Sequence, residues 1–386
     1  MPGMGLRNIR LGSLMGIPVL VNPSWFVLFG ITTWYLATQF YPDALEEASS
    51  LTHYAMAIAS VLVFFASVVL HELAHSLVAR AFKIPVKSIT LFVLGGVAQI
   101  TREAARPWHE LLMAIAGPLM SLALGGLFVL AWWLAGASGE RPIDFVLVWL
   151  AIMNVILGVF NLLPAFPMDG GRVFRAAVWL ITGSYHRATT VAGWTGRGFA
   201  ALMIGLGTLA AFGFDVWVAR DVAGGVWFVL IGLFLENAAR QSLFQNRLVR
   251  ELQRYRAEDI MNADPPVVAG NLSVASLARG VLELNPRVCY FVQQDGRLAG
   301  ILSGYQMREI PEEYWDRMTA WEAMVPSGRL RATARDRLLS DVLLEMETEE
   351  LLHMPVVDDG RVIGVIARDR ILGVLRQAGL LGSARA

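Results

Sequence analysis

Two histidines flank a glutamate within the five-residue run His71-Glu72-Leu73-Ala74-His75. Residues four apart lie on the same face of a helix, so the two imidazoles can bind one metal ion together. The carboxylate of Glu72 can then reach a water molecule on that ion. The chain contains only 6 histidines, so a chance origin of this spacing is improbable. The run therefore predicts a zinc site with Glu72 as the catalytic residue.

The segment that carries this motif is apolar enough to cross a membrane. Residues 59–70, directly before His71, contain no charged side chain. Ionisable side chains at membrane depth are costly and are usually functional. The alternative, hydrogen-bonded core histidines beside a buried glutamate, would carry the same cost with no metal to offset it. We therefore expect a zinc hydrolase whose site lies within the membrane.

The composition supports an integral membrane protein. Of the 386 residues, 55% are hydrophobic and only 17% are charged, and the mean hydropathy is +0.52. Long apolar runs dominate up to about Leu243, whereas the remainder is rich in charges and has no run long enough to span. The formal net charge of +0 gives no reason to expect a nucleic-acid partner. The single cysteine, Cys289, excludes an internal disulfide framework and a cysteine-rich zinc site.

Six segments approach the length of about 20 apolar residues that a membrane-spanning helix needs. They are Ser24–Phe40, His53–Val78, Leu111–Leu134, Phe145–Leu163, Thr189–Phe212 and Val222–Ala238. The connection 79–107 carries several lysines and arginines, whereas 41–52 carries none. Because cytoplasmic loops are enriched in these residues, we expect both termini to lie in the cytoplasm. The two histidines then lie in the cytoplasmic half of the second span, in a multi-pass protein of the plasma membrane.

Between the second and third spans, Val86–Ile100 is too short to cross the membrane as a helix. Its β-branched residues and the pair Gly95-Gly96 predict a hairpin. We expect a re-entrant hairpin that borders the active site, with Gly95 and Gly96 lining the cavity and a strand edge that pairs with an unwound substrate. A plain cytoplasmic loop is the alternative, and the sequence leaves both open.

Catalytic zinc usually takes three protein ligands and keeps a fourth position for water. The best candidate for the third ligand is Asp169, which follows the fourth span at the depth of the two histidines. Near it, Pro164 and Pro167 break the helix, and Gly170-Gly171 permit close backbone approach. The alternative role for Asp169 is a helix cap in a Pro/Gly turn. We expect Asn161, Pro164 and Pro167 to line the site.

The residue types also define the chemistry. Zinc lowers the pKa of a bound water toward about 7, and a nearby carboxylate can take the proton as general base. We expect one zinc ion per chain, bound by His71, His75 and Asp169. Glu72 then acts as the base for hydrolysis of a peptide bond.

The two motifs resemble those of the site-2 protease family of intramembrane zinc metalloproteases. The run 71–75 is similar to the family's metal-binding motif, and 161–171 is similar to its Asn-x-x-Pro-x-x-Pro-x-Asp-Gly motif. Ala116-Gly117-Pro118 and Ser121 in the third span also look like the family. The resemblance covers Ile9 to about Ala239, and it departs at Asn22, where many relatives have histidine.

This resemblance implies zinc ligation by His71, His75 and Asp169, with Glu72 as the catalytic base. It also implies that the substrates are transmembrane segments of other proteins. Such substrates are often membrane-tethered regulators of transcription that an earlier cut has already shortened. The expected fold over residues 1–243 is therefore a six-span helical membrane domain with a re-entrant hairpin.

Residues 257–378 contain an internal repeat. The segment Asp295–Ile301 recurs as Asp359–Val365, about 64 residues later. Each copy predicts a helix, a strand, an Asp-Gly turn and a second strand. The predicted helices and first strands are Val274–Leu284 and Val288–Gln293 in one copy, and Leu338–Glu347 and Met354–Val357 in the other. The tail resembles a cytoplasmic α/β tandem pair of cystathionine-β-synthase (CBS) domains, with copies over 257–310 and 321–378.

CBS pairs associate with one another and often bind adenine nucleotides. The resemblance therefore leaves open whether the chain forms a homodimer and whether it binds a nucleotide. Relatives that bind ribose carry an aspartate in Gly-x-x-Thr/Ser-x-x-Asp after the last strand. The first copy has Gln306 at that position, and the second has Arg370, with Asp369 beside it. A dimerisation or docking module without nucleotide is at least as well supported, and the nucleotide-binding residues stay unknown.

The connector 244–256 carries Arg247, Arg250, Arg254 and Arg256. Such a cluster beside a membrane span usually anchors to anionic lipid, so we expect membrane lipid among the partners. The whole chain predicts an intramembrane zinc endopeptidase modulated by a CBS pair. The alternative is a CBS-gated transporter or channel, although only one span is broken and transporters show matched broken helices in two halves.

Overall fold

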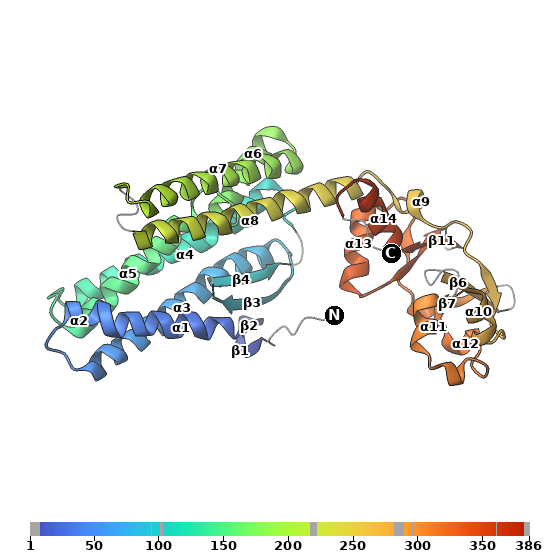
Figure 1. The fold of residues 1–386 in the computed structure, drawn as a ribbon, viewed down its shortest axis with the longest axis horizontal. Coiled ribbons are helices and arrows are strands. Elements are labelled where there is room, and N and C mark those ends of the chain that lie inside the picture. Colours follow the sequence, from blue (N-terminus) through green and yellow to red (C-terminus); the bar gives the residue numbers. More distant parts are fainter. Residues whose placement is uncertain are drawn as a thin grey trace. The chain divides into compact units, whose positions relative to one another are not determined.

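The structure is a computed structural model that describes residues 8–93, 95–100, 103–216, 222–281, 289–294, 297–359 and 361–381. The chain forms two compact units, Met1–Leu243 and Phe244–Ala386 (Figure 1). Some predicted features lie outside the described residues. They are the helix end at Leu284, the strand start at Val288, and the turn residues Asp295, Gly296 and Gly360.

Helices make up most of the first unit. They are α1 (Ser24–Tyr35), the π-helical turn η1 (Leu36–Phe40), α2 (Tyr41–Ala44), α3 (Ser50–Ala81), α4 (Pro107–Leu134), α5 (Pro142–Asn161), α6 (Asp169–Thr182), α7 (Tyr185–Ala211) and α8 (Val222–Leu252). Among the described helices, α3, α4, α5 and α8 are long and apolar enough to cross a membrane. They confirm the prediction of a multi-pass helical membrane protein. The first and fifth predicted spans correspond to α1 and α7, which are not among these four.

Small residues let the membrane-type helices pack closely. Gly125 of α4 faces Val155 of α5, where an added Cβ atom would lie 2.9 Å from the valine side chain. Gly158 of α5 faces Leu122 of α4 in the same way, at 3.0 Å. Lipid tails are as apolar as the side chains, so close packing at small residues, rather than hydrophobic burial, holds such helices together.

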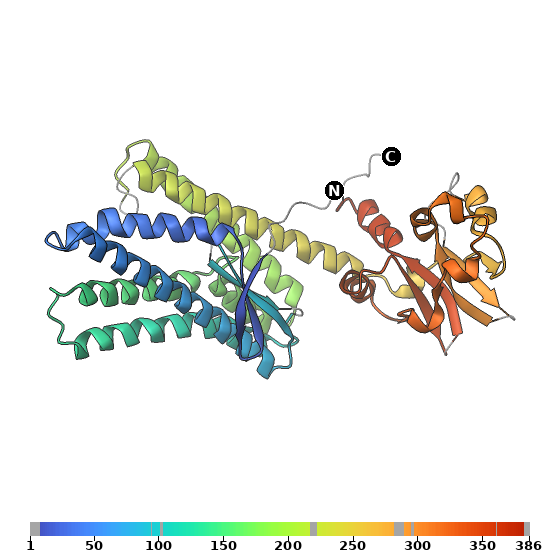
Figure 2. The same cartoon turned by 90° about the horizontal axis from the view of Figure 1, so that it is seen from below.

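The predicted hairpin forms, and it belongs to a larger sheet than we expected. The strands β3 (Val86–Phe92) and β4 (Gly95–Ile100) pair antiparallel. On its other side, β3 pairs in parallel with β2 (Ile17–Val21), which pairs with β1 (Ile9–Leu14). The order β1-β2-β3-β4 leaves one edge of β4 without a partner strand among the described residues. Figure 2 shows the sheet at one end of the helices, beside α3.

Buried side chains fix this sheet to the helix that carries the histidines. Ile17 of β2, Ile89 of β3 and Leu73 of α3 form one buried cluster. In contrast, β1 is exposed along its whole length. The sequence analysis did not predict β1 and β2. The strand β1 is exposed and has no buried face, and β2 is a short run of apolar residues without polar alternation.

The second unit consists of two halves with the same topology. In the first half, β5 (Val267–Ala269) is parallel to β6 (Cys289–Gln294), which is antiparallel to β7 (Arg297–Ser303). In the second half, β9 (Thr333–Ala334), β10 (His353–Asp358) and β11 (Arg361–Ala367) repeat this arrangement. The helices are α9 (Ala257–Ile260), α10 (Val274–Val281), α11 (Gly304–Glu309), α12 (Ala320–Ala323), α13 (Leu339–Thr348) and α14 (Arg368–Gln377). The shared topology confirms the internal repeat.

Candidate metal centre and active site

The helix α3 places His71 and His75 one turn apart on one face, and both rings are buried. The Nδ1 atom of His71 lies 2.8 Å from the hydroxyl of Ser121, and Nδ1 of His75 lies 2.6 Å from the backbone carbonyl of Met113. Both partners belong to α4. These bonds hold the two Nε2 atoms 3.2 Å apart. The hydrogen bonds at the Nδ1 atoms therefore orient the rings and their Nε2 atoms, as such bonds do in metal-binding histidines.

One face of α4 lies opposite the two histidines, because Met113, Gly117 and Ser121 follow one another at four-residue spacing. A Cβ atom added to Gly117 would come within 2.6 Å of Nε2 of His71, and closer still to Nε2 of His75. Only glycine leaves this space open. Our predicted site did not include Gly117, Ser121 or the Met113 carbonyl. The signal that could have identified them is the four-residue spacing that matches the spacing of the histidines.

Asp169 is the first residue of α6 and follows a tight turn from α5. A Cβ atom on Gly170 would overlap the carbonyl oxygens of Leu162 and Leu163, and one on Gly171 would lie 2.8 Å from the backbone nitrogen of Phe166. The two glycines therefore let the first turn of α6 lie directly on the end of α5. This close packing brings the aspartate carboxylate to the histidines.

The geometry of His71, His75 and Asp169, which we call the ligand cluster, fits a zinc ion. Oδ2 of Asp169 lies 3.2 Å from Nε2 of His71 and 3.1 Å from Nε2 of His75. The neutral ring of His75 donates its Nδ1 proton to the Met113 carbonyl, so its Nε2 atom carries a lone pair. That lone pair faces a second imidazole and a carboxylate, an arrangement that favours a cation. Tetrahedral zinc with bonds of about 2.0–2.1 Å separates its ligand atoms by about 3.3 Å, close to the spacing found here.

Glu72 lies beside the ligand cluster and is oriented by the hairpin. The backbone N–H of Ala98 in β4 donates to its Oε2 atom at 3.1 Å. A Cβ atom added to Gly96 would come 2.7 Å from Cγ of Glu72, so the strand lies directly against this side chain. The carboxylate interacts electrostatically with all three residues of the ligand cluster. In the part of the chain that the structure describes, Oε1 accepts no hydrogen bond and is available for chemistry.

The other predicted lining residues occupy different positions. Gly95 lies at the hairpin turn with a φ of +127°, a conformation that favours glycine, and has open space around it. Asn161 donates to the carbonyl of Leu157 within its own helix. Pro164 and Pro167 are exposed in the turn between α5 and α6. Of this set, Gly96 is the one that the structure brings against Glu72, and the lining role of the others stays a prediction.

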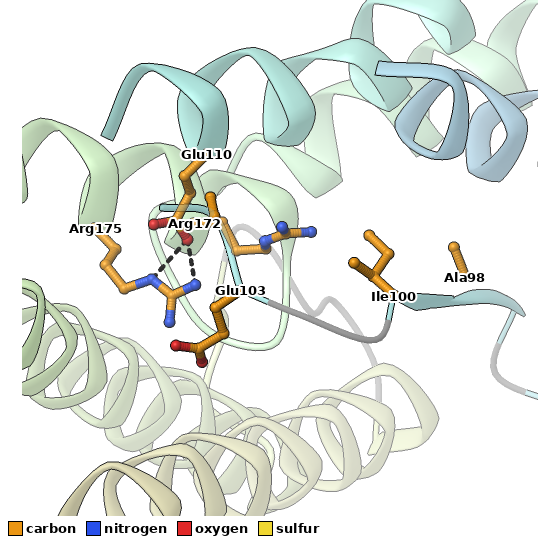
Figure 3. A pocket seen from close by; sticks show the side chains of 7 residues that line it. Ala98, Ile100, Glu103, Glu110, Arg172 and Arg175 are labelled. Atoms are coloured by element: carbon orange, nitrogen blue, oxygen red, sulfur yellow. Dashed lines mark hydrogen bonds and ion pairs between the residues drawn. The ribbon is translucent and has the colours of Figure 1, made fainter. Parts of the chain in front are cut away.

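A polar pocket of about 280 Å³ opens beyond the end of β4 (Figure 3). Its lining residues are Ala98, Ile100, Glu103, Ala104, Glu110, Arg172 and Arg175. Arg175 of α6 forms a buried ion pair with Glu110 of α4, with Nε 2.7 Å from Oε1. The guanidinium also lies over the rings of Phe166 and Tyr185, 5.2 and 4.8 Å from their centroids. This pair ties the helix of Asp169 to the helix that orients the histidines.

Comparisons relate the chain to known proteins over nearly its whole length. The sequence profile of peptidase family M50 matches residues 59–140 and 134–205, and that of the CBS domain matches 332–377. A protein of Synechocystis sp. assigned as a zinc metalloprotease is 32% identical over 375 residues, which cover 96% of each chain. One from Mycobacterium tuberculosis, assigned in the same way, is 32% identical over 376 residues, 96% of this chain and 94% of that one. The solved structure of a site-2 protease from Methanocaldococcus jannaschii, 29% identical, covers 61% of this chain and 95% of that chain with a TM-score of 0.41.

A cluster of side chains that could hold a metal ion, beside a glutamate on a membrane-type helix, is the arrangement expected of a membrane-embedded metallohydrolase. The chain belongs to peptidase family M50, the site-2 proteases, since relatives that are 32% identical match 96% of its length. It is an intramembrane zinc protease with a CBS domain pair. This confirms the enzyme class that the motifs predict.

Proposed function

We propose that His71, His75 and Asp169 bind one zinc ion per chain and that Glu72 is the general base of peptide hydrolysis. The observation that carries this assignment is the convergence of three ligand atoms, all within 4.8 Å of one another, beside a glutamate that the hairpin orients. A helix cap, the alternative role of Asp169, does not account for its contacts with both imidazoles.

The zinc ion, when bound, supplies Lewis acidity toward water and toward a peptide carbonyl. The residues of the chain supply orientation and proton transfer. Ser121 and Met113 hold the two imidazoles in place, so Nε2 of each ring is ready to ligate without rearrangement. Glu72 takes the proton of the attacking water and delivers it to the nitrogen of the leaving amine. The hydrogen bond from Ala98 keeps the glutamate beside the ligand cluster throughout.

Replacement of Glu72 by glutamine tests the assignment, because it removes the carboxylate that acts as the base and keeps the size and shape of the side chain. We expect Glu72→Gln to retain one zinc per chain in metal analysis and to lose at least about 100-fold in turnover. Asp169→Asn should lose turnover and zinc together. Substantial proteolysis by Glu72→Gln, or purified wild type without stoichiometric zinc, would contradict the proposal.

We propose that the substrates are transmembrane segments of membrane-tethered regulatory proteins that another protease has already shortened. In a helix every peptide carbonyl is engaged by the backbone, so a substrate must unwind before attack. The free edge of β4, next to Glu72, offers backbone groups with which an unwound segment can pair. Membrane proteomics of cells with wild type or Glu72→Gln should identify a single-span protein that accumulates only with the variant.

For the topology we propose six spans, in which α1 and α7 complete the four long helices. The hairpin β3–β4 is then re-entrant at the depth of the histidines, and both termini and the CBS pair lie in the cytoplasm, on the plasma membrane. The asymmetry of lysine and arginine between the connections supports this orientation. Cysteine scanning along Val86–Ile100, in a background without Cys289, should show protection next to Glu72. Uniform reactivity with an aqueous reagent would contradict a membrane-embedded hairpin.

We propose that the CBS pair modulates proteolysis through self-association or protein docking rather than through a nucleotide. Gln306 accepts a hydrogen bond from the backbone of Ser303 at 2.8 Å, and Tyr305 donates to Asp369 at 3.0 Å. The polar groups at and beside the matched ribose positions are therefore already bonded within the protein. Calorimetric titration of the full chain with ATP and AMP should give flat traces, with a dimer seen by light scattering. Saturable heat would instead favour nucleotide control.

A further inference from the structure

The pocket beyond β4 contains a cation that has no partner in the described part of the chain. Arg172 lines this pocket, and none of the hydrogen bonds or ion pairs of the described residues involves its guanidinium. The neighbouring Arg175 is fully engaged by Glu110 and two aromatic rings. Figure 3 shows the Arg172 side chain extending toward Ile100, whereas the Glu103 carboxylate lies on the Arg175 side. Arg172 is therefore available to a ligand.

The position of Arg172 connects this cation to the reaction site. Arg172 follows Asp169 by three residues on α6, so the two lie on neighbouring positions of one helix face. On the other wall, Ala98 both lines the pocket and holds Glu72. Ile100 lies two residues further along β4 on the same edge, about 6.6 Å beyond Ala98. The pocket thus begins where the glutamate is held and continues in the direction of the strand.

We propose that Arg172 is a specificity-determining residue that binds the carboxylate of an aspartate or glutamate in the substrate, two or three residues from the scissile bond. This inference rests on the proposed function. A segment that pairs with the β4 edge advances about 3.3 Å per residue, so such a side chain reaches the pocket while the scissile carbonyl lies at Glu72. A guanidinium binds a carboxylate through two parallel hydrogen bonds. Arg175 already interacts with both Glu110 and Glu103, so Arg172 is the pocket-lining cation without a carboxylate partner among the described residues.

Purified full-length protein in detergent tests the proposal with a defined peptide library. Each peptide has a leucine- and alanine-rich core with one aspartate, asparagine or lysine, placed at successive positions. Mass spectrometry reads the cleaved bond and the relative kcat/KM. We expect wild type to favour aspartate over lysine by at least about 10-fold at one position, two or three residues from the cut. Arg172→Glu should reverse the preference at that position alone, and Arg172→Lys should keep aspartate preferred.

Two comparisons separate the possible outcomes. Arg187→Glu is the matched control, since this arginine is exposed at the start of α7, outside the pocket, and its reversal should leave the preference unchanged. If Arg172 instead anchors a lipid phosphate, Arg172→Glu will lower cleavage of all peptides equally, and the proposal is wrong. An aspartate preference that survives Arg172→Glu overturns it as well. Cleavage that does not depend on Glu72 would defeat the proposed function, and this inference with it.

Discussion

At the scale of single residues, two glycines are as necessary to the site as the residues that carry its chemistry. Gly117 keeps a side chain out of the space between the two imidazoles, and Gly96 lets β4 lie against Glu72. Neither position tolerates even a methyl group without a shift of an imidazole or of the Glu72 side chain. Histidines and carboxylates can be identified in a sequence by their chemistry. Glycines that leave space for them can be identified only when their spacing in the sequence matches the spacing of those residues.

Gly117→Ala should abolish metal binding and activity together. The added methyl group would contact both Nε2 atoms, which are the proposed ligand atoms. Zinc content of the purified variant, measured beside its turnover, checks this. Gly126→Ala is the matched control, because nothing lies within 4 Å of a Cβ atom at that position of the same helix. A variant at Gly117 with full zinc content would show that the cluster does not hold the metal.

Gly96→Ala should separate metal binding from catalysis. The three atoms nearest to its methyl group belong to Glu72 and Val68 rather than to the ligand cluster, so the Glu72 side chain would shift and zinc content should stay near one per chain. We expect turnover to fall about 10- to 100-fold, as for a displaced general base. Gly30→Ala, at an open position of α1, serves as the control. Loss of zinc from Gly96→Ala would contradict this division of roles.

At the scale of elements, the long apolar helices could be predicted, but the elements that complete the site could not. The predicted second, third and fourth spans match α3, α4 and α5 to within a few residues, because each contains enough apolar residues to identify it. The helix α6 was not predicted, since two glycines directly follow its first residue and disfavour a helix in isolation. Its start depends on tertiary contact with the end of α5.

The ion pair between α4 and α6 should be important for stability. Glu110→Gln would remove the carboxylate that pairs with the buried guanidinium of Arg175, and breaking a buried ion pair costs about 3–5 kcal/mol. We expect a clear fall in the thermal unfolding midpoint of the detergent-solubilised protein. Arg240→Gln is the control. It removes only the ion pair between Arg240, which is exposed, and Glu236, and such a pair contributes about 0.3–0.5 kcal/mol. Equal effects of the two changes would contradict a structural role for the buried pair.

The strand β10 should make the second unit sensitive to mild acid. Burial of His353, partly offset by Asp369, lowers the pKa of its imidazole. As the pH falls below the ordinary histidine pKa, this side chain is protonated in the unfolded state before it is protonated in the folded state. The free energy of unfolding is therefore highest above that pKa and decreases as the pH falls. The hydrogen-exchange protection factors in β10, which are corrected for the intrinsic pH dependence of exchange, should fall more between about pH 7.5 and about pH 5.5 in wild type than in His353→Gln. The same fall in both proteins would rule out this histidine as the cause.

At the scale of the whole molecule, two features of the site could be learned only from the fold. They are the distance between Asp169 and the histidines and the full extent of the β-sheet. The type of the third ligand could be predicted from zinc chemistry, but its distance from the histidines could not, because 94 residues separate His75 from Asp169. The β-sheet could be predicted only as a hairpin, because β1 and β2 come from a separate part of the chain. Pairings between distant segments leave no periodic signal in either segment.

Removal of the metal should destabilise the first unit, Met1–Leu243, and leave the second unit, Phe244–Ala386, unchanged. All proposed ligands belong to the first unit, and a ligand present at 1,000 times its dissociation constant stabilises the folded state by about 4 kcal/mol. After chelation, hydrogen exchange should increase in α3, α4 and α6 and stay unchanged in β10 and β11. Readdition of zinc should reverse the change. An equal increase in the second unit would contradict the separation.

The long interval between the histidines and the aspartate also affects the order in which the enzyme becomes active. A ribosome delivers α3, with both imidazoles and the glutamate, well before the turn that precedes α6. Until that turn folds back, the nascent chain lacks Asp169, the one carboxylate of the proposed ligand set, beside its histidines. On this assignment the site is completed only after α6 has been synthesised and has packed against the end of α5, so proteolysis cannot begin before that step.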